Sequence, residues 1–190
     1  MIRIGILGDI GSGKSFVAKK FGYPVFNADE EVSKLYFKNK KIYSKLRKKL
    51  PKYIKSFPVK KNEISEAILS QNSNLKKIVE IVHAEIRIKM NFFIKKNKNK
   101  KIIILDIPLL LENKINKKND ILVFVDSKKS EIFKRLKNRK NFNSKLFKKF
   151  KNIQLPLAYK KKKSDYIIKN DFTEKTIKKS IKFILNKLII

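Results

Sequence analysis

The sequence predicts an α/β protein built on a parallel β-sheet that is covered by helices. Short apolar segments, suited to strands, alternate with longer segments in which apolar residues recur every three or four positions. Two of the short segments, 101–106 and 120–126, are nearly continuous apolar runs, which is typical of strands buried on both faces. All five glycines lie within the first 22 residues, around the first expected turn. Strands that alternate with helices favour a parallel sheet.

The expected elements follow one another in a regular order. A β-branched apolar run opens the chain as a strand, a helix follows the glycines, and a proline opens the second strand. Strands are predicted at 2–7, 23–27, 101–106, 120–126 and 165–169, and helices at 14–21, 28–50, 64–70, 75–94, 128–140, 144–153 and 173–188. Pro51 and Pro58 bracket a loop, and the KKNKNK segment (95–100) is expected to be a turn. The resulting sheet has five strands.

The chain is strongly basic. Its 190 residues include 49 Lys and Arg against 16 Asp and Glu, which gives a formal net charge of +33. Hydrophobic residues make up 42%, enough to build a core and to argue against simple disorder. The charge would suit a nucleic-acid binder or a site for a small polyanionic ligand. Compositional drift is favoured, because the lysines are spread along the chain and arginine, which reads bases and phosphates, is scarce.

Several classes of site are excluded by composition. The chain has no cysteine and one histidine, so disulfides, thiolate zinc sites, a cysteine nucleophile and zinc sites with several histidines are ruled out. Glycines interrupt the N-terminal apolar stretch, and no apolar run reaches 18 residues, so neither a signal peptide nor a transmembrane helix is expected. We therefore expect a cytoplasmic protein of one domain.

Residues 8–15, GDIGSGKS, match the phosphate-loop pattern G-x-x-x-x-G-K-[ST]. A glycine-rich turn of this kind points backbone N–H groups at an anion, and the helix that follows adds its N-terminal dipole. Lys14 would contact the β- and γ-phosphates of a nucleotide, and the Ser15 hydroxyl would ligate Mg²⁺. The expected nucleotide-binding residues of this segment are Gly8, Gly11, Ser12, Gly13, Lys14, Ser15 and Phe16. A dinucleotide-binding fingerprint fails, because it requires glycine where Phe16 stands.

The remaining motifs favour a small-molecule kinase over other nucleotide-binding classes. A GTPase should carry N-K-x-D after a strand, and the nearest candidate, at Asn116-Lys117, has the wrong spacing and precedes a strand. A kinase of the nucleotide-kinase type should have an acidic residue near the second strand, a helical insertion for the acceptor and an arginine-bearing lid helix. The chain offers Asp29, a helical segment from about 30 to 95, and Arg135 with Arg139, which are four residues apart and would share a helix face.

Taken in order, these motifs resemble the dephospho-CoA kinase family over nearly all 190 residues. The resemblance rests on GDIGSGKS (8–15), VFNADEEV (25–32), IVHAEI (81–86), DIPLLLE (106–112), KRLKNR (134–139) and the spaced Gln154, Lys160, Asp165 and Asn170. It implies a three-layer P-loop kinase fold with a five-stranded parallel sheet. It also implies the final step of coenzyme A biosynthesis, in which ATP phosphorylates the ribose 3′-hydroxyl of dephospho-CoA to give CoA and ADP.

The same resemblance implies roles for individual residues. Asp29 would accept or orient the proton of the 3′-hydroxyl, although an aspartate at a strand-to-helix junction also suits a helix N-cap. Arg135 and Arg139 would neutralise charge on the phosphates, or would form only a solvated basic face. Asp106 would orient Mg²⁺ through water, or would merely cap the end of a strand. The acceptor is expected at His83, Pro108, Leu109 and Glu112 as well as Asp29, and the adenine near Asn170.

We expect a single kinase domain over 1–190. Its core would comprise 1–29, 101–127 and 164–190, its acceptor-binding insertion about 30–95, and its lid about 128–160. The expected partners are ATP with Mg²⁺ and dephospho-CoA, without a specific nucleic acid or a membrane, and the protein would be a monomer or a weak homo-oligomer. A kinase for another nucleoside or nucleotide, and a basic nucleic-acid-binding NTPase, remain as alternatives.

Five positions depart from the family pattern. Phe16 stands where the family commonly has threonine, and Lys61 stands where an arginine is usual. Asn27 stands where the family has a first aspartate, and it would form hydrogen bonds but not help to hold a cation. Asp9 replaces a usual glycine of the phosphate loop, and we expect its side chain to point to solvent because its charge is close to the phosphates. Ala84 replaces the proline after His83.

Overall fold

The structure, a computed structural model, describes residues 1–139 and 142–188. Within these residues five strands form one fully parallel sheet in the order β2-β3-β1-β4-β5. The strands are β1 (Ile2–Gly8), β2 (Val25–Asn27), β3 (Ile102–Asp106), β4 (Ile121–Asp126) and β5 (Tyr166–Lys169). Every residue of β3 is buried, as its unbroken apolar sequence predicts for a strand covered on both faces. The predicted five-stranded parallel sheet is confirmed.

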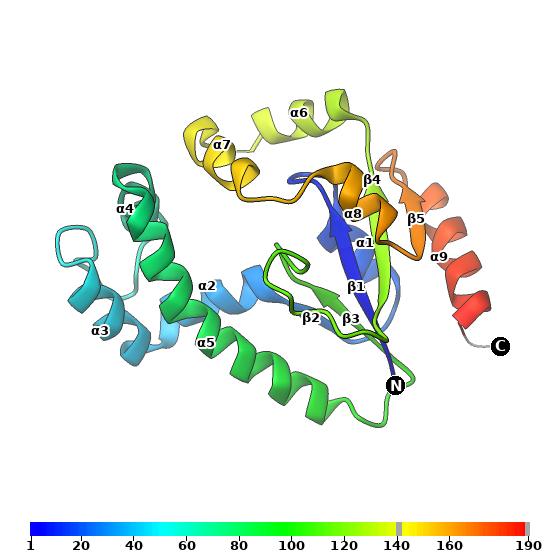
Figure 1. Cartoon of the computed structure of the whole chain (residues 1–190), viewed down its shortest axis with the longest axis horizontal. Coiled ribbons are helices and arrows are strands. Elements are labelled where there is room, and N and C mark those ends of the chain that lie inside the picture. Colours follow the sequence, from blue (N-terminus) through cyan, green and yellow to red (C-terminus); the bar gives the residue numbers. More distant parts are fainter. Residues whose placement is uncertain (140–141, 189–190) are drawn as a thin grey trace. The chain divides into compact units, whose positions relative to one another are not determined.

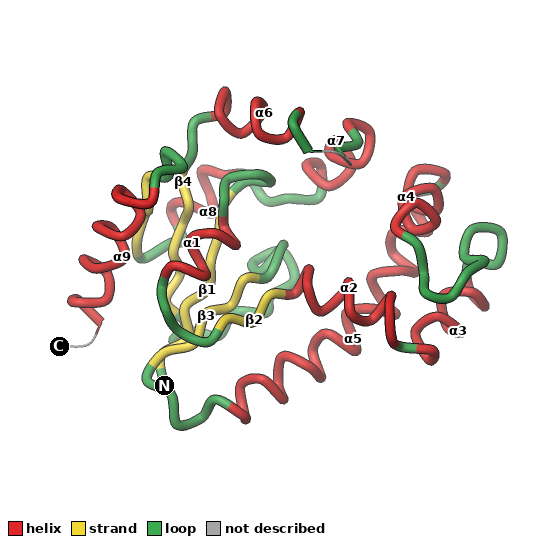
Figure 2. The backbone as a smooth tube through the Cα atoms, turned by 180° about the vertical axis from the view of Figure 1, so that it is seen from behind, coloured by secondary structure: helices red, strands yellow, loops and turns green. Residues whose placement is uncertain are grey.

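The chain divides into two compact units, and the first of them holds the sheet. It comprises residues 1–27, 97–142 and 150–190. Its helices are α1 (Lys14–Lys20), α6 (Lys129–Lys137), α8 (Leu157–Lys162) and α9 (Glu174–Leu188). Helices α1 and α9 cover one face of the sheet and α8 lies on the other, as the opposite views of Figures 1 and 2 show. The core joins Ile4, Ile104 and Val123 of the strands to Val17 of α1 and Ile181 of α9.

The second unit is helical and comprises residues 28–96 and 143–149. It contains α2 (Ala28–Lys38), α3 (Lys40–Lys49), α4 (Lys61–Ser70), α5 (Asn72–Lys96) and the first part of α7 (Ser144–Asn152). Helices α2, α3 and α4 each contact α5. The buried residues of α5 include Ile78, Val82, Ile86 and Met90, whose four-residue spacing aligns them on one helix face. The division of the chain into core, acceptor insertion and lid stays a prediction.

Most predicted elements are shifted at their ends by up to three residues, and Lys95 and Lys96 belong to α5 rather than to the expected turn. Beyond these shifts, the observed elements differ from the predicted ones at three places. The single helix expected over 28–50 is two helices, because the Asn39 side chain accepts a hydrogen bond from the Ile42 N–H (3.0 Å) and starts α3 afresh. Helix α8 was not predicted, since six residues are too few to show a periodic pattern. Helix α6 stops at Lys137, and its expected last residue, Lys140, lies outside the described residues.

Candidate active site

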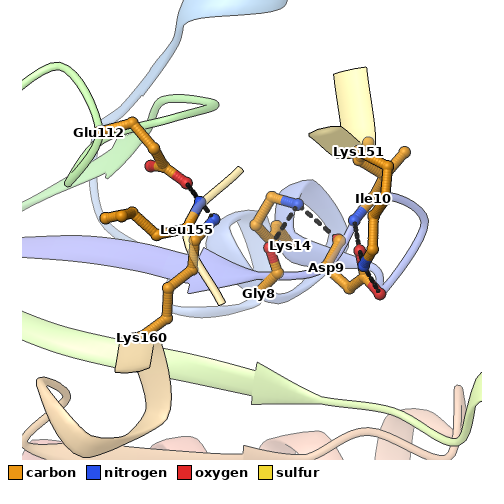
Figure 3. Close-up of polar contacts among 8 residues, drawn as sticks. All are labelled: Gly8, Asp9, Ile10, Lys14, Glu112, Lys151, Leu155 and Lys160. Carbon is orange, nitrogen blue, oxygen red and sulfur yellow. Dashed lines mark hydrogen bonds and ion pairs between the residues drawn. The ribbon is translucent and has the colours of Figure 1, made fainter. Parts of the chain in front are cut away.

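The phosphate loop connects the central strand β1 to α1. Gly11 and Gly13 have φ values of 84° and 87°, a left-handed conformation that side chains disfavour. Gly13 is the N-cap of α1 and has no side-chain cap. The Lys14 ammonium donates to the Asp9 carbonyl at 2.7 Å and to the Gly8 carbonyl at 3.4 Å, so it folds back over the loop (Figure 3). The loop therefore has the left-handed glycine conformations and the lysine ammonium that its sequence predicts.

Asp9 does not point to solvent, so that expectation is wrong. The residue is only 9% exposed, and the Lys151 ammonium lies 2.6 Å from each of its carboxylate oxygens (Figure 3). One of these oxygens also accepts a hydrogen bond from the Ile10 N–H at 2.7 Å. A carboxylate can be buried here because a cation is paired with it, since an unpaired buried charge is costly.

Two residues from the C-terminal half of the chain, Asn170 and Ser127, hold the phosphate loop through hydrogen bonds. The Asn170 amide nitrogen donates to the Ser12 carbonyl at 2.8 Å, and the Ser127 hydroxyl donates to the same carbonyl at 2.9 Å. The Asn170 side-chain oxygen accepts a hydrogen bond from the Phe172 N–H at 2.8 Å. Asn170 thus braces the phosphate loop, and its expected place near the adenine stays a prediction.

Asn27 and Asp106 lie side by side at the carboxyl edge of the sheet. They are paired in the register of β2 and β3, and the Asn27 amide donates to an Asp106 carboxylate oxygen at 2.6 Å. The departure to asparagine therefore places a donor, rather than a second negative charge, beside the buried Asp106. In α/β sheets this edge is where ligands bind.

The two magnesium ligands expected from the sequence, Ser15 and Asp106, are both oxygen donors. Ser15 is exposed at the start of α1, and Asp106 ends the strand next to β1. The described residues contain no cluster of three or more His, Cys, Asp or Glu side chains that would hold a metal by itself. Mg²⁺ at phosphate-binding sites usually takes one or two protein oxygen groups together with the phosphates, so these two side chains fit such a site, and their role as ligands stays a prediction.

The two arginines do not share a helix face as expected. Arg135 lies on α6 and is exposed. Its guanidinium lies 4.3 Å from the centre of the Phe172 ring. Arg139 lies beyond the end of α6, because Asn138 caps the helix and Arg139 bonds back to the Leu136 carbonyl. The four-residue spacing predicted a shared face only on the assumption that the helix continues.

Phe16 and the residues that follow β3 belong to the same unit as the phosphate loop. Phe16 is exposed, with the Lys20 ammonium 5.3 Å from its ring centre. Pro108 and Leu109 are partly buried in the turns that follow β3, and Leu109 has a φ of 58°. These turns lead to Glu112, which belongs to the same unit as the phosphate loop.

Glu112 makes a buried ion pair. One carboxylate oxygen lies 2.6 Å from the Lys160 ammonium and accepts a hydrogen bond from the Leu155 N–H at 3.0 Å (Figure 3). The other oxygen is buried and has no hydrogen-bond partner within residues 1–139 and 142–188. One carboxylate oxygen of Glu112 thus has a structural role, and the other is buried without a hydrogen-bond partner among the described residues.

Asp29 and His83 belong to the second unit, whereas the phosphate loop belongs to the first. Asp29 is exposed in the first turn of α2. The helix begins one residue earlier, so the alternative of Asp29 as its N-cap is wrong. His83 is partly buried on α5, and burial together with the nearby Arg87 charge lowers the pKa of its imidazole. This shift favours the neutral form of the imidazole.

Sequence reasoning missed three residues that shape the site: Ser127, Lys151 and Phe172. Lys151 is one of 44 lysines, and nothing in the sequence distinguishes it. Asp9 was the available signal, because a charge within a phosphate loop requires a compensating cation somewhere in the fold.

A parallel sheet with a phosphate loop between β1 and α1, and a helical unit inserted after β2, defines a P-loop kinase. The sequence model of the dephospho-CoA kinase family matches residues 2–176. A dephospho-CoA kinase from Wolbachia sp. subsp. Brugia malayi is 33% identical over 190 residues, covering 97% of this chain and 97% of that protein. This chain therefore belongs to the dephospho-CoA kinase family, whose enzymes catalyse the final step of coenzyme A biosynthesis.

Solved structures agree with this fold. TT1252 from Thermus thermophilus is similar with a TM-score of 0.76 at 24% identity, covering 98% of this chain and 97% of that one. Dephospho-CoA kinase from Campylobacter jejuni has a TM-score of 0.61 at 20% identity, covering 98% and 96%. The predicted family, fold class and phosphotransferase class are thus confirmed. The described residues also form no helix long and apolar enough to cross a membrane.

Proposed function

We propose that this chain transfers the γ-phosphoryl group of ATP to the ribose 3′-hydroxyl of dephospho-CoA, giving CoA and ADP. The observation that carries the proposal is a braced phosphate loop in a chain of this family. Lys14 donates onto the loop, and Asn170 and Ser127 hold the Ser12 carbonyl. A loop held in this way presents its backbone N–H groups without reorganising, which favours binding of the triphosphate.

Charge neutralisation in this proposal comes from Lys14, Arg135 and Arg139. Lys14 contacts the β- and γ-phosphates, and the exposed arginines close over the charge that develops during transfer. Ser15 and Asp106 would hold Mg²⁺, which when bound neutralises charge on the phosphate oxygens. The chain itself supplies the positioning, and this dominates because the transition state is loose.

Asp29 accepts or orients the proton of the acceptor hydroxyl. Its side chain is exposed, and it follows the last residue of β2, Asn27, by only two positions, so backbone connectivity ties it to the end of that strand. Because positioning matters more than basicity in phosphoryl transfer, a carboxylate with an ordinary pKa suffices for this role.

The acceptor is bound by His83, Pro108, Leu109 and Glu112. The unpartnered oxygen of Glu112 supports this assignment, because a buried acceptor atom is stabilised by any hydrogen-bond donor that reaches it. A neutral His83 would contribute hydrogen bonding and packing rather than a charge. Under this proposal the enzyme acts on small molecules in the cytoplasm, as a monomer or a weak homo-oligomer and without a specific nucleic acid.

The test is release of ADP that depends on both dephospho-CoA and Mg²⁺. Asp29→Asn should lower kcat by about 100-fold or more, the usual contribution of a positioned proton acceptor. Glu30→Gln, an exposed neighbour on the same helix turn, is the matched control and should retain full turnover. Full turnover in Asp29→Asn contradicts the role of Asp29. A panel of nucleosides and nucleotides tests the acceptor, and a better acceptor than dephospho-CoA overturns the proposed substrate.

A further inference from the structure

Two lysines are held by one residue of the phosphate loop. The main-chain carbonyl of Asp9 accepts from the Lys14 ammonium at 2.7 Å, and its carboxylate accepts from the Lys151 ammonium at 2.6 Å (Figure 3). The Asp9 side chain is 12% exposed and that of Lys151 is 37% exposed. Lys14 and Lys151 are therefore both bound to Asp9, which carries the one negative charge within residues 8–15.

The position of Lys151 is fixed by its own surroundings. It lies in the last turn of α7, and its carbonyl accepts a hydrogen bond from the Gln154 N–H at 3.2 Å. The next residue, Leu155, donates its N–H to Glu112. The segment that carries Lys151 is thus anchored a few residues further on, and its ammonium reaches Asp9 from a defined place.

Without Lys151, the Asp9 carboxylate would oppose nucleotide binding in two ways. It would repel the phosphates, because a negative charge in a partly buried site is poorly screened. It would also compete for Lys14, since the Lys14 ammonium is already within hydrogen-bond distance of the Asp9 main chain. A Lys14 paired with this carboxylate would be less available to the β- and γ-phosphates.

We propose that Lys151 is a positioning residue for the nucleotide, acting through Asp9 rather than by touching the phosphates. Its ammonium neutralises the Asp9 carboxylate and keeps it away from Lys14, so that the loop binds an anion despite its own negative charge. This inference rests on the proposed binding of ATP to the loop.

A double-mutant cycle of Lys151→Met and Asp9→Asn tests the inference. Dissociation constants are measured for ATP, ADP and adenosine by titration calorimetry. Lys151→Met should weaken ATP binding by about tenfold or more, ADP binding by less, and adenosine binding not at all, because the repulsion grows with phosphate charge. In the Asp9→Asn background the same change should weaken ATP binding by less than about threefold, because no carboxylate remains to be neutralised.

Two further variants separate charge from folding. Lys151→Arg keeps the cation and should bind ATP within about threefold of wild type. Lys148→Met changes an exposed lysine of the same helix and should alter neither nucleotide affinity nor the melting temperature. If Lys151→Met does not fold, two comparisons still test the inference. Lys151→Arg is compared with wild type, and the double variant is compared with Asp9→Asn, where a large loss of ATP affinity contradicts the inference.

The outcomes are distinct. An equal loss of ATP affinity in both backgrounds, or an equal loss for ATP and adenosine, overturns the inference. Unchanged ATP affinity in Lys151→Met overturns it as well. Failure of the wild-type protein to bind ATP instead overturns the nucleotide site itself, so the two failures are distinguishable.

Discussion

Replacing Gly13 by alanine is expected to disable the phosphate loop through one identifiable contact. A Cβ atom at this position would lie 2.5 Å from the Asn170 amide nitrogen and 3.3 Å from a carbon of the Phe172 ring. The amide does not swing aside freely, because it donates to the Ser12 carbonyl, its oxygen accepts from the Phe172 N–H, and the residue is 3% exposed. The backbone is also left-handed, with φ at 87°.

The cost of the left-handed backbone and the cost of the lost hydrogen bonds together give the expected loss of stability. The left-handed conformation costs an alanine about 1–2 kcal/mol. Displacing Asn170 weakens or breaks two hydrogen bonds worth about 1 kcal/mol each. Gly13→Ala should therefore lower the free energy of unfolding by about 2–4 kcal/mol. If ATP binding has to restore the conformation of the loop, each 1.4 kcal/mol required for this raises the dissociation constant of ATP about tenfold.

Gly22→Ala is the matched control. Gly22 also has a positive φ, 74°, but a Cβ there meets nothing within 4 Å. It should lose about 1–2 kcal/mol of stability from the backbone alone and keep its ATP affinity. Urea unfolding and calorimetric titration with ATP measure both quantities. If Gly13→Ala is no less stable than Gly22→Ala and binds ATP as wild type does, the contact with Asn170 does not constrain the loop.

Three further predictions concern the rest of the site. Arg135→Ala should lower kcat by about 100-fold or more in the coupled ADP assay, whereas Lys137→Ala on the same helix should not; equal rates would remove the arginine from catalysis. Lys160→Met leaves the Glu112 carboxylate buried without its cation, and urea unfolding should show a loss of about 3–5 kcal/mol, while wild-type stability would mean that the pair contributes nothing. The folded-state pKa of His83 is lowered from 6.5 by burial and a neighbouring arginine, so its contribution to stability is present above pH 6.5 and is lost as the pH falls towards the folded-state pKa. His83→Gln should therefore show a smaller loss of stability between about pH 7 and pH 5 than wild type, and an equal loss would contradict this sign.

The sequence by itself determined the architecture and the chemistry of the loop. Apolar runs with β-branched residues and helical periodicities fixed the five strands and most helices, because these patterns are local and repeat along the chain. The GDIGSGKS segment fixed the phosphate loop, because its residues are contiguous. Errors at this level were local as well: Asn39 restarts a helix and Asn138 ends one.

Only the tertiary structure decided which side chains meet at the loop. Asp9 pairs with Lys151, and Asn170 bonds to Ser12, across 142 and 158 positions of sequence. Contacts of this range leave no periodic signal, and a single lysine among 44 carries no mark of its partner. The physical reason is that a buried charge is compensated by whichever cation the fold brings within reach, and the folded chain alone determines that distance.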